Sequence, residues 1–593
     1  MKYHNIILIL VLFYTSSAFS TNYYFSESLG NDSWSGTLPV PNNNNTNGPK
    51  RSLSAFNGLM NSLAKAGDSI FLRRGDRWSG STGIVIGAAQ GTPTNYIFIG
   101  AYGIGNKPLI DKTGTGEVLL CRASANAAAS YLRIQNLALT SSSAIGNRPV
   151  GAYINEAFYT LRPHDIILDN LHISNCLSGM ILYQENIIIE NCLLEKNGNQ
   201  GTGHGIFSSA DHVIFRNNVF DSNGCGSFFV HTMYISQCMD VLFEGNEIRN
   251  ADDGLKLRSS NDLVIKNNII HDMYIHTIHV GGDSGSGTKN VTIEGNVVYN
   301  SPQGIEIKSE SGTQTLLSEN ITIKNNILPA QVIVSNTCPV KDIFIYNNLI
   351  HSTNNQNALL YFNSPNPVNV QIKNNIFYKT SANTNHALVS VLSTTGLTGV
   401  TMDHNLYYFP VASSNILRVG NNNYSTLSSF RTAFPIQELN GQQGNPNFVS
   451  APGDFHLTAA SALAIDKGAN VTGVVHLDIE GMPRPLDGDG VNGASWDIGP
   501  YEYCCFPVGT KTVDLNNEIE IYPNPANDEI TIITSKETPE KILIIDTSGK
   551  IVLESNQNSH QNKFNTKHFN KGMYFVQVYL KSGIMSAKLI LIK

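Results

Sequence analysis

The residues best suited to do chemistry lie between His204 and Lys308, where one short strand pattern recurs five times. The five segments are 204–209, 231–236, 253–258, 276–281 and 303–308. Their third and fifth positions are mostly aliphatic, which predicts that these side chains fill a core while the fourth and sixth positions face outward. The first position shares the parity of the core, but it is polar in all five segments, so we expect it to face outward as well.

The predicted outward face carries imidazoles, carboxylates, a phenol and cations. If the strands stack in parallel at about 4.8 Å, these side chains share one surface about 20 Å long. The candidate catalytic residues are Lys256, Arg258, His231, Tyr234 and His279, and the candidate substrate-binding residues are His204, His276, Lys308 and Glu306. We expect this surface to be the active site.

Two cations on one strand define the chemistry that we expect. Lys256 and Arg258 should lie about 7 Å apart, and each disfavours charge on the other, which predicts a lowered pKa and a basic role for Lys256. Arg258 and Lys308 suit substrate carboxylates, while Tyr234 and the histidines can move protons. Such a set suits β-elimination on an anionic polymer of uronic acids, which needs a base at C5 and positive charge beside the carboxylate.

Three other activities fit the same face. An inverting glycoside hydrolase would use Asp253 and Glu306, whose strands lie two coils or about 9.6 Å apart, a gap that leaves room for a water molecule. A C5-epimerase shares the first step of the lyase. A non-catalytic glycan-binding surface protein should carry more outward aromatic side chains than Phe207 and Tyr234. We rank the lyase first, the hydrolase second, and the other two after them.

A longer repeat positions these segments. Between Tyr131 and Tyr408 an aliphatic strand followed by Asn recurs at roughly 22 to 30 residues, which is typical of a solenoid. The Asn residues that fall at one position of successive coils are Asn218, Asn246, Asn268, Asn296, Asn326, Asn348, Asn375 and Asn405. Asn tolerates left-handed backbone geometry and bonds its neighbours, so we expect a stacked Asn ladder at a tight turn of an all-β, right-handed parallel β-helix.

The ends of the chain differ from the repeat. Residues 1–20 have the charged start, apolar run and small residues of a secretory signal peptide. Residues 52–65 have helical spacing and should cap the open end of a β-helix that spans 21–503. After a linker at 504–517, residues 518–593 change to Lys-rich alternating strands, which predicts a small C-terminal β-sandwich.

Composition excludes several classes of protein. The formal net charge of −7 argues against a nucleic-acid binder, whose footprint would be basic. Beyond the signal peptide no apolar run is long enough to span a membrane. We therefore expect a monomer that is secreted or held at the cell surface.

The stretches 281–289 and 310–319 lengthen their coils beside the candidate site and should form the walls of a cleft.

Several stretches resemble known families. The segments 521–526, 571–577 and 588–593 resemble the C-terminal sorting domain of the type IX secretion system, which implies that machinery as a partner. The helix followed by Ala66-Gly67-Asp68 resembles the N-terminal entry of secreted parallel β-helix proteins.

Two further segments resemble polysaccharide lyases. The stretch 250–254, which contains Asp252 and Asp253, resembles the calcium-binding segment of family 9 polysaccharide lyases, although Lys256 stands where that family has a further Asp. This resemblance implies Asp252 and Asp253 as calcium ligands, in a site that lacks the further Asp. The stretch 303–310 resembles the calcium and base motif of family 6 lyases.

Overall fold

The computed structural model describes residues 20–503 and 519–591, apart from gaps at 126, 156–160, 199–201, 228, 284–285, 310–315, 330, 336, 353–356, 393–395, 413, 492, 524–525, 527, 535–536, 547–550, 557–558, 571 and 581–582. Residues 1–19 of the predicted signal peptide and the predicted linker lie outside the described residues. The chain forms two compact units: the first extends to Glu480 and includes Trp496–Tyr501, and the second comprises Gly481–Ser495 and Glu502–Lys593.

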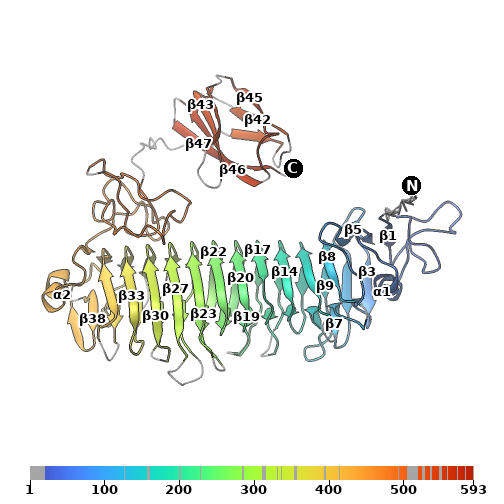
Figure 1. Cartoon of the computed structure of the whole chain (residues 1–593), viewed down its shortest axis with the longest axis horizontal. Coiled ribbons are helices and arrows are strands. Elements are labelled where there is room, and N and C mark those ends of the chain that lie inside the picture. Colours follow the sequence, from blue (N-terminus) through green and yellow to red (C-terminus); the bar gives the residue numbers. More distant parts are fainter. Residues whose placement is uncertain are drawn as a thin grey trace, which may run out of the picture. The chain divides into compact units, whose positions relative to one another are not determined.

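The first unit is a parallel β-helix, as predicted, with three strands in most of its coils (Figure 1). One sheet contains β1 (Asn22–Phe25), β2 (Ser69–Arg73), β5 (Ile97–Tyr102), β8 (Ser130–Gln135), β11 (His164–Asp169), β14 (Glu185–Glu190), β17 (Val213–Arg216), β20 (Met239–Glu244), β22 (Asn261–Lys266), β24 (Lys289–Glu294), β27 (Ser318–Lys324), β30 (Val340–Tyr346), β33 (Val368–Lys373) and β36 (Val400–Asp403).

A second sheet, here named the site sheet, carries the five segments singled out in the sequence. Its strands are β4 (Ile84–Ile86), β7 (Glu117–Cys121), β10 (Val150–Ile154), β13 (Met180–Leu182), β16 (Ile206–Ser208), β19 (Met233–Ser236), β21 (Glu247–Arg258), β23 (Ile269–Gly281), β26 (Gln303–Ile307), β29 (Gln331–Val334), β32 (Leu360–Phe362), β35 (Val389–Val391) and β38 (Leu417–Val419), with antiparallel β39 (Asn422–Tyr424) beside β38.

The third sheet meets the site sheet at a corner. Its strands are β3 (Arg77–Gly80), β6 (Leu109–Lys112), β9 (Ala138–Thr140), β12 (His172–Ser174), β15 (Leu193–Glu195), β18 (Val219–Asp221), β25 (Val297–Tyr299), β28 (Ile327–Leu328), β31 (Leu349–Ser352), β34 (Ile376–Lys379), β37 (Leu406–Tyr408) and β40 (Gln442–Gln443), together with the first halves of β21 and β23. These two strands run unbroken through the corner, whereas the other coils use separate strands there.

Alternation along each strand builds the core. The third and fifth positions of the five segments, such as Ile206, Leu255 and Ile307, are at most 1 % exposed and belong to one continuous apolar cluster that runs the length of the unit. Two helices close the ends of this cluster. Helix α1 (Leu53–Ser62) contributes Phe56, and α2 (Leu427–Ala433) contributes Phe430.

The predicted Asn ladder is present and buried. From Asn218 to Asn405 each side-chain N–H donates to the amide oxygen of the next ladder Asn at 2.9–3.0 Å. The left-handed backbone falls one residue earlier than we predicted, for example at Asn267 (φ 56°) and Asn325 (φ 55°). The turn therefore uses one residue for its shape and the next for the bonds that join the coils.

The second unit contains the predicted β-sandwich. β41 (Ile519–Tyr522), β42 (Glu529–Thr534) and β45 (Gln561–Asn565) form one antiparallel sheet, and β43 (Lys541–Asp546), β44 (Ile551–Ser555), β46 (Gly572–Leu580) and β47 (Gly583–Leu591) form the other. Buried residues of both sheets, among them Ile532 and Val576, share one core. The part of the chain that the structure describes contains no helix with the length and hydrophobicity of a membrane span.

Six cysteines in the described residues are free thiols, and five of them are buried. Cys192 lies in line with the Asn ladder, where its backbone N–H donates to Asn218 Oδ1 at 2.9 Å. Burial raises the pKa of the Cys121, Cys176, Cys192 and Cys238 thiols to about 12. These side chains are therefore small apolar core groups.

The ladder ends on a buried acid, which makes its stability depend on pH. Glu438 Oε1 accepts bonds from Asn405 Nδ2 and the Tyr407 hydroxyl, both at 2.7 Å. Burial raises the pKa of Glu438 from 4.5 to about 7, although these bonds favour the carboxylate. A raised folded-state pKa gives stability that is complete at low pH and is lost as the pH rises, here between about 4.5 and 7.

We predict that Glu438→Gln loses this pH dependence, because an amide stays neutral. As the pH rises from 4.5 to 7, the free energy of unfolding of the variant should rise relative to that of the wild type, by on the order of 3 kcal/mol in total. The difference between the two melting temperatures should change in the same direction. Thermal unfolding followed by circular dichroism tests this, with the exposed Glu185→Gln as control. Parallel pH profiles for Glu438→Gln and wild type would contradict it.

Candidate active site

One row of the candidate site follows the backbone register of the site sheet. Phe207 pairs with Tyr234, Tyr234 with Lys256, Lys256 with His279, and His279 with Glu306. This is the predicted fourth position of the five segments. Because parallel strands lie about 4.8 Å apart, each of these side chains has the next one as its neighbour.

A second row comes from the first position. The His204 ring stacks on His231 and on Tyr234, with centroids 5.5 Å and 5.4 Å apart, so both rows lie on the outer side of the strands. The register between β21 and β23 shifts between Ala251 and Asp253, at the corner where both strands stay unbroken. Such an irregularity turns a side chain to a new direction, which explains how residues with the parity of the core face the other row.

Asp253 is held between two imidazoles. His231 Nδ1 lies 2.8 Å from Asp253 Oδ2, and His276 Nδ1 lies 2.6 Å from Asp253 Oδ1. Burial alone would raise the pKa of Asp253, but the bonds from His231 and His276 hold it well below its usual range. Burial lowers the pKa of His231 despite the bond to Asp253. Both directions are met at neutral pH if the ionised Asp253 carboxylate accepts an N–H bond from a neutral His231.

Glu306 joins the two rows. Its Oε2 atom lies 3.6 Å from His276 Nε2 and 3.5 Å from His279 Nδ1. This oxygen is buried and has no hydrogen-bond partner among the described residues. A buried polar atom without a partner is rare in proteins and marks a place for a water molecule or a ligand group. Asp253, His276, Glu306 and His279 thus form one continuous network of carboxylates and imidazoles.

Cations and burial keep the imidazoles of His204 and His279 neutral. Burial, followed by the charges of His231 and Lys256, lowers the pKa of His204 to about 4. Burial, followed by the charges of Arg258 and Lys256, holds the pKa of His279 well below its usual value. Neutral imidazoles can accept protons over the whole neutral range. Lys256 and Lys308 are half-buried, so both reach the outer face.

Arg258 is not accessible on the outer face, contrary to our expectation. Its side chain is among the largest fully buried ones, with 1 % of the residue exposed. The loop after Gly281 folds back over the end of β21, where Ser259 Oγ donates to Ser286 O at 2.8 Å and accepts from Asp283 N at 2.8 Å. This loop is part of the predicted cleft wall, of which 284–285 and 310–315 lie outside the described residues. The buried Arg258 cannot contact a substrate, and its charge is one of those that lower the pKa of His279.

The expected calcium ligands do not converge. Asp252 Oδ2 accepts the Gly226 N–H at 2.7 Å, while both oxygens of Asp253 face imidazoles. Within the described part of the chain, neither residue belongs to a group of three ligand atoms close enough to share an ion. Calcium takes six or more oxygens. Asp252 and Asp253 alone do not make a calcium site, and calcium binding stays a prediction from the sequence.

Two coils before the five segments extend the outer face with residues that we did not single out. Tyr153 and Asn155 belong to the coil of β10, and Tyr183 and Gln184 to that of β13. Their segments begin with Gly151 and Gly179, as 204–209 has Gly205 at its second position. That shared glycine was the signal in the sequence, but the first positions there are Val150 and Ser178 and not the His, Asp or Gln of the five segments.

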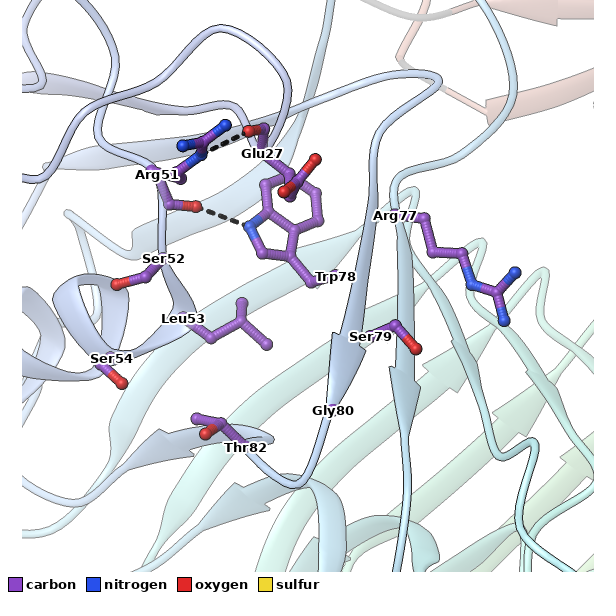
Figure 2. A pocket seen from close by; sticks show the side chains of 10 residues that line it. All are labelled: Glu27, Arg51, Ser52, Leu53, Ser54, Arg77, Trp78, Ser79, Gly80 and Thr82. Carbon is purple, nitrogen blue, oxygen red and sulfur yellow. Dashed lines mark hydrogen bonds between the residues drawn. The ribbon is translucent and has the colours of Figure 1, made fainter.

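A separate hollow of about 450 Å³ lies beside α1 (Figure 2). Its lining residues are hydrogen-bonded to one another: Trp78 Nε1 donates to Arg51 O, and Arg51 Nε donates to Glu27 O. Six strand steps separate β4 from β21, about 30 Å along the β-helix. This hollow is therefore not part of the network around Asp253.

Two families of known domains match the chain. Residues 228–350 match the right handed beta helix region, in agreement with the predicted handedness. Residues 520–593 match the secretion system C-terminal sorting domain, which directs the protein to the cell surface or the extracellular space by type IX secretion. A search of curated proteins finds no match.

Solved structures similar to the chain include carbohydrate-active enzymes. An alginate lyase from a Paenibacillus species is 15% identical and covers 50% of this chain and 93% of its own, with a TM-score of 0.32. A mannuronan C-5 epimerase A-module from Azotobacter vinelandii is 13% identical, covering 64% and 89% with a TM-score of 0.30. A lacto-N-biosidase from Eubacterium ramulus is 14% identical, covering 72% and 67% with a TM-score of 0.30. At these values the likeness carries no argument about the reaction.

We predict that Asp253→Asn destabilises the folded protein, whereas Asp252→Asn at the neighbouring position does not. The amide of Asn has one acceptor oxygen in place of the two carboxylate oxygens, so it cannot accept an N–H group from His231 and from His276 on separate oxygens. The Asp253→Asn variant should therefore lose about 1–3 kcal/mol of unfolding free energy at pH 7. Because the folded-state pKa of Asp253 is depressed, this penalty should shrink as the pH falls below 3.8. Thermal unfolding between pH 3 and 7 tests it, and equal melting temperatures for Asp253→Asn and wild type at pH 7 would contradict it.

Proposed function

We propose that this protein cleaves an anionic polysaccharide of uronic acids by β-elimination. In that reaction a base removes the proton at C5, the bond between C4 and the glycosidic oxygen breaks, and an acid protonates the leaving oxygen. A double bond remains between C4 and C5 of the new non-reducing end. The placement of Lys256 between Tyr234 and His279 is the observation that carries the proposal, because the reaction needs a base and an acid side by side, with positive charge close to them.

Each step has a residue that suits it. We assign the base to Lys256, which lies between Tyr234 and His279 in the outer row. We assign the acid to Tyr234, whose ring stacks on His231 and His204 and is thereby held in place. His276, whose side chain is 22 % exposed, binds a sugar hydroxyl, and Asp253 fixes its ring and that of the buried His231.

Positive charge must offset the charge that builds on the substrate carboxylate as the proton leaves C5. Lys308, on the strand beyond His279, suits that task, and the buried Arg258 adds to the positive potential. A bound cation such as calcium would serve the same purpose, but Asp252 and Asp253 alone do not supply its ligands. No step proposed for Lys256 or Tyr234 passes through a metal.

The geometry supports the hydrolase less well. A pair of carboxylic groups for inverting hydrolysis needs one of them free to activate water. Both oxygens of Asp253 already accept imidazole N–H groups, and His276 stands between Asp253 and Glu306. An epimerase would use the same base as the lyase, so only its product separates the two.

Incubation of the protein with alginate, pectate, ulvan and glycosaminoglycans tests the reaction class. A lyase produces ultraviolet absorbance from unsaturated uronates together with new reducing ends. Reducing ends alone would show a hydrolase. Neither signal on any of these polymers would overturn the proposal in favour of an epimerase or a glycan-binding protein, and a change in uronate composition would identify the epimerase.

We predict that Lys256→Ala lowers the rate of absorbance increase by about 10²–10⁴-fold, the range that a general base contributes. The fold should persist, because Lys256 lies on the outer face and the core of its strand is aliphatic. Lys266→Ala is the matched control, since Lys266 sits on β22 of another sheet and pairs with Glu244 at 2.9 Å. Full activity of Lys256→Ala would exclude it as the base.

A further inference from the structure

The outer face of the site sheet continues past the proposed active site toward the N-terminal coils. Three strand steps separate β13 from β21, so the side chains beside β13 lie about 14 Å from the row of Lys256. The coils of β10 and β13 place Tyr153, Asn155, Tyr183 and Gln184 there. The proposed reaction gives none of these four side chains a role.

The Tyr183 ring is turned out of the aromatic stack. Phe207 and Tyr234 stack nearly in parallel, with an interplanar angle of 16°. Tyr183 is inclined by 51° to Phe207 and by 80° to Tyr153, so neither ring stacks in parallel on it. The residue is 41 % exposed, which is high for a tyrosine within a row of packed rings. Part of its ring is therefore available to a flat apolar partner.

A chain of amides lies beside this ring. Gln184 Nε2 donates to Asn155 Oδ1 at 3.3 Å, and Asn155 Nδ2 donates to the Tyr153 hydroxyl oxygen at 2.6 Å. Gln184 is only 8 % exposed, and its Oε1 atom has no hydrogen-bond partner among the described residues. A buried amide oxygen that the fold leaves unsatisfied needs a donor from outside the protein, because the desolvation of such a group is costly.

We propose that these four residues form a saccharide-binding subsite. A sugar ring presents an apolar C–H face and a rim of hydroxyl groups, which fits a partly exposed aromatic ring beside an unsatisfied acceptor. The Tyr183 ring contacts the apolar face, and a sugar hydroxyl donates to Gln184 Oε1. The Tyr153 hydroxyl, whose oxygen already accepts from Asn155, donates its proton to a second sugar oxygen.

The position of the subsite sets the kind of ligand. None of the four side chains carries a charge, so the subsite holds a sugar by its face and hydroxyls and does not select its carboxylate. At about 14 Å from Lys256, a ligand that fills both places must be an oligosaccharide. The assignment of this subsite to one side of the cleaved bond rests on the proposed function; binding at the subsite does not.

Affinity electrophoresis tests binding without any need for turnover. The Lys256→Ala chain is run through gels that contain alginate, polygalacturonate, ulvan or chondroitin sulfate, alone and combined with Tyr183→Ala or Gln184→Ala. We expect at least one polymer to retard the chain, and each added substitution to weaken that binding about five- to tenfold. Tyr299→Ala is the matched control, because Tyr299 is 40 % exposed and lies on the third sheet. Its retardation should equal that of the parent chain.

The outcomes separate the subsite from the reaction. Retardation by none of the four polymers, or equal retardation of the Tyr183→Ala, Gln184→Ala and parent chains, overturns the subsite. If the ultraviolet assay is silent while Tyr183→Ala weakens retardation, the subsite stands and the lyase falls. If the assay is positive while Tyr183→Ala and Gln184→Ala bind and turn over like wild type, the lyase stands and the subsite falls. Melting temperatures within a few degrees of the parent confirm that each variant is folded.

Discussion

The need to satisfy buried amides fixes the spacing of the coils between Asn218 and Asn405. Each ladder Asn is enclosed in the core and bonds to the coils before and after it, so each of these coils must return to the same height above its neighbour. A coil displaced along the axis would leave several buried donors and acceptors without partners. The ladder therefore holds the outer face in register as well, because the same coils carry the ladder and the candidate site.

This register is what brings distant residues together. Lys256 and His279 lie 23 positions apart in the sequence and yet share a backbone pairing. The carboxylates of Asp253 and Glu306 lie on β21 and β26 and are joined through His276 on the strand between them. Rigid strands, rather than loops, thus set the distances in the network, which is the condition for bonds that are short and specific.

The fold and the rows of the site could be predicted because both follow from period-2 alternation repeated in coil after coil. The depth of each side chain could not. Arg258 obeys the alternation, but it is buried next to the point where the loop that begins at Gly281 bonds to Ser259, and alternation carries no information about loops. Tyr183 and Gln184 escaped notice because the first position of their coil is Ser178 and not the His, Asp or Gln of the five segments. The first-position row was anticipated from polarity alone, and on β21 and β23 it begins at a register shift between Ala251 and Asp253.

The free thiols have a consequence for export. A sorting domain at 520–593 sends this chain out of the reducing cytoplasm into surroundings in which unprotected cysteines are oxidised or form mixed disulfides. In the finished β-helix the raised pKa of buried thiols such as Cys121 and Cys192 leaves almost no reactive thiolate, which slows their oxidation. An unfinished coil has no such protection. Closure of each coil around its cysteine therefore competes with oxidation, and a slow-folding variant should accumulate as covalently cross-linked aggregates.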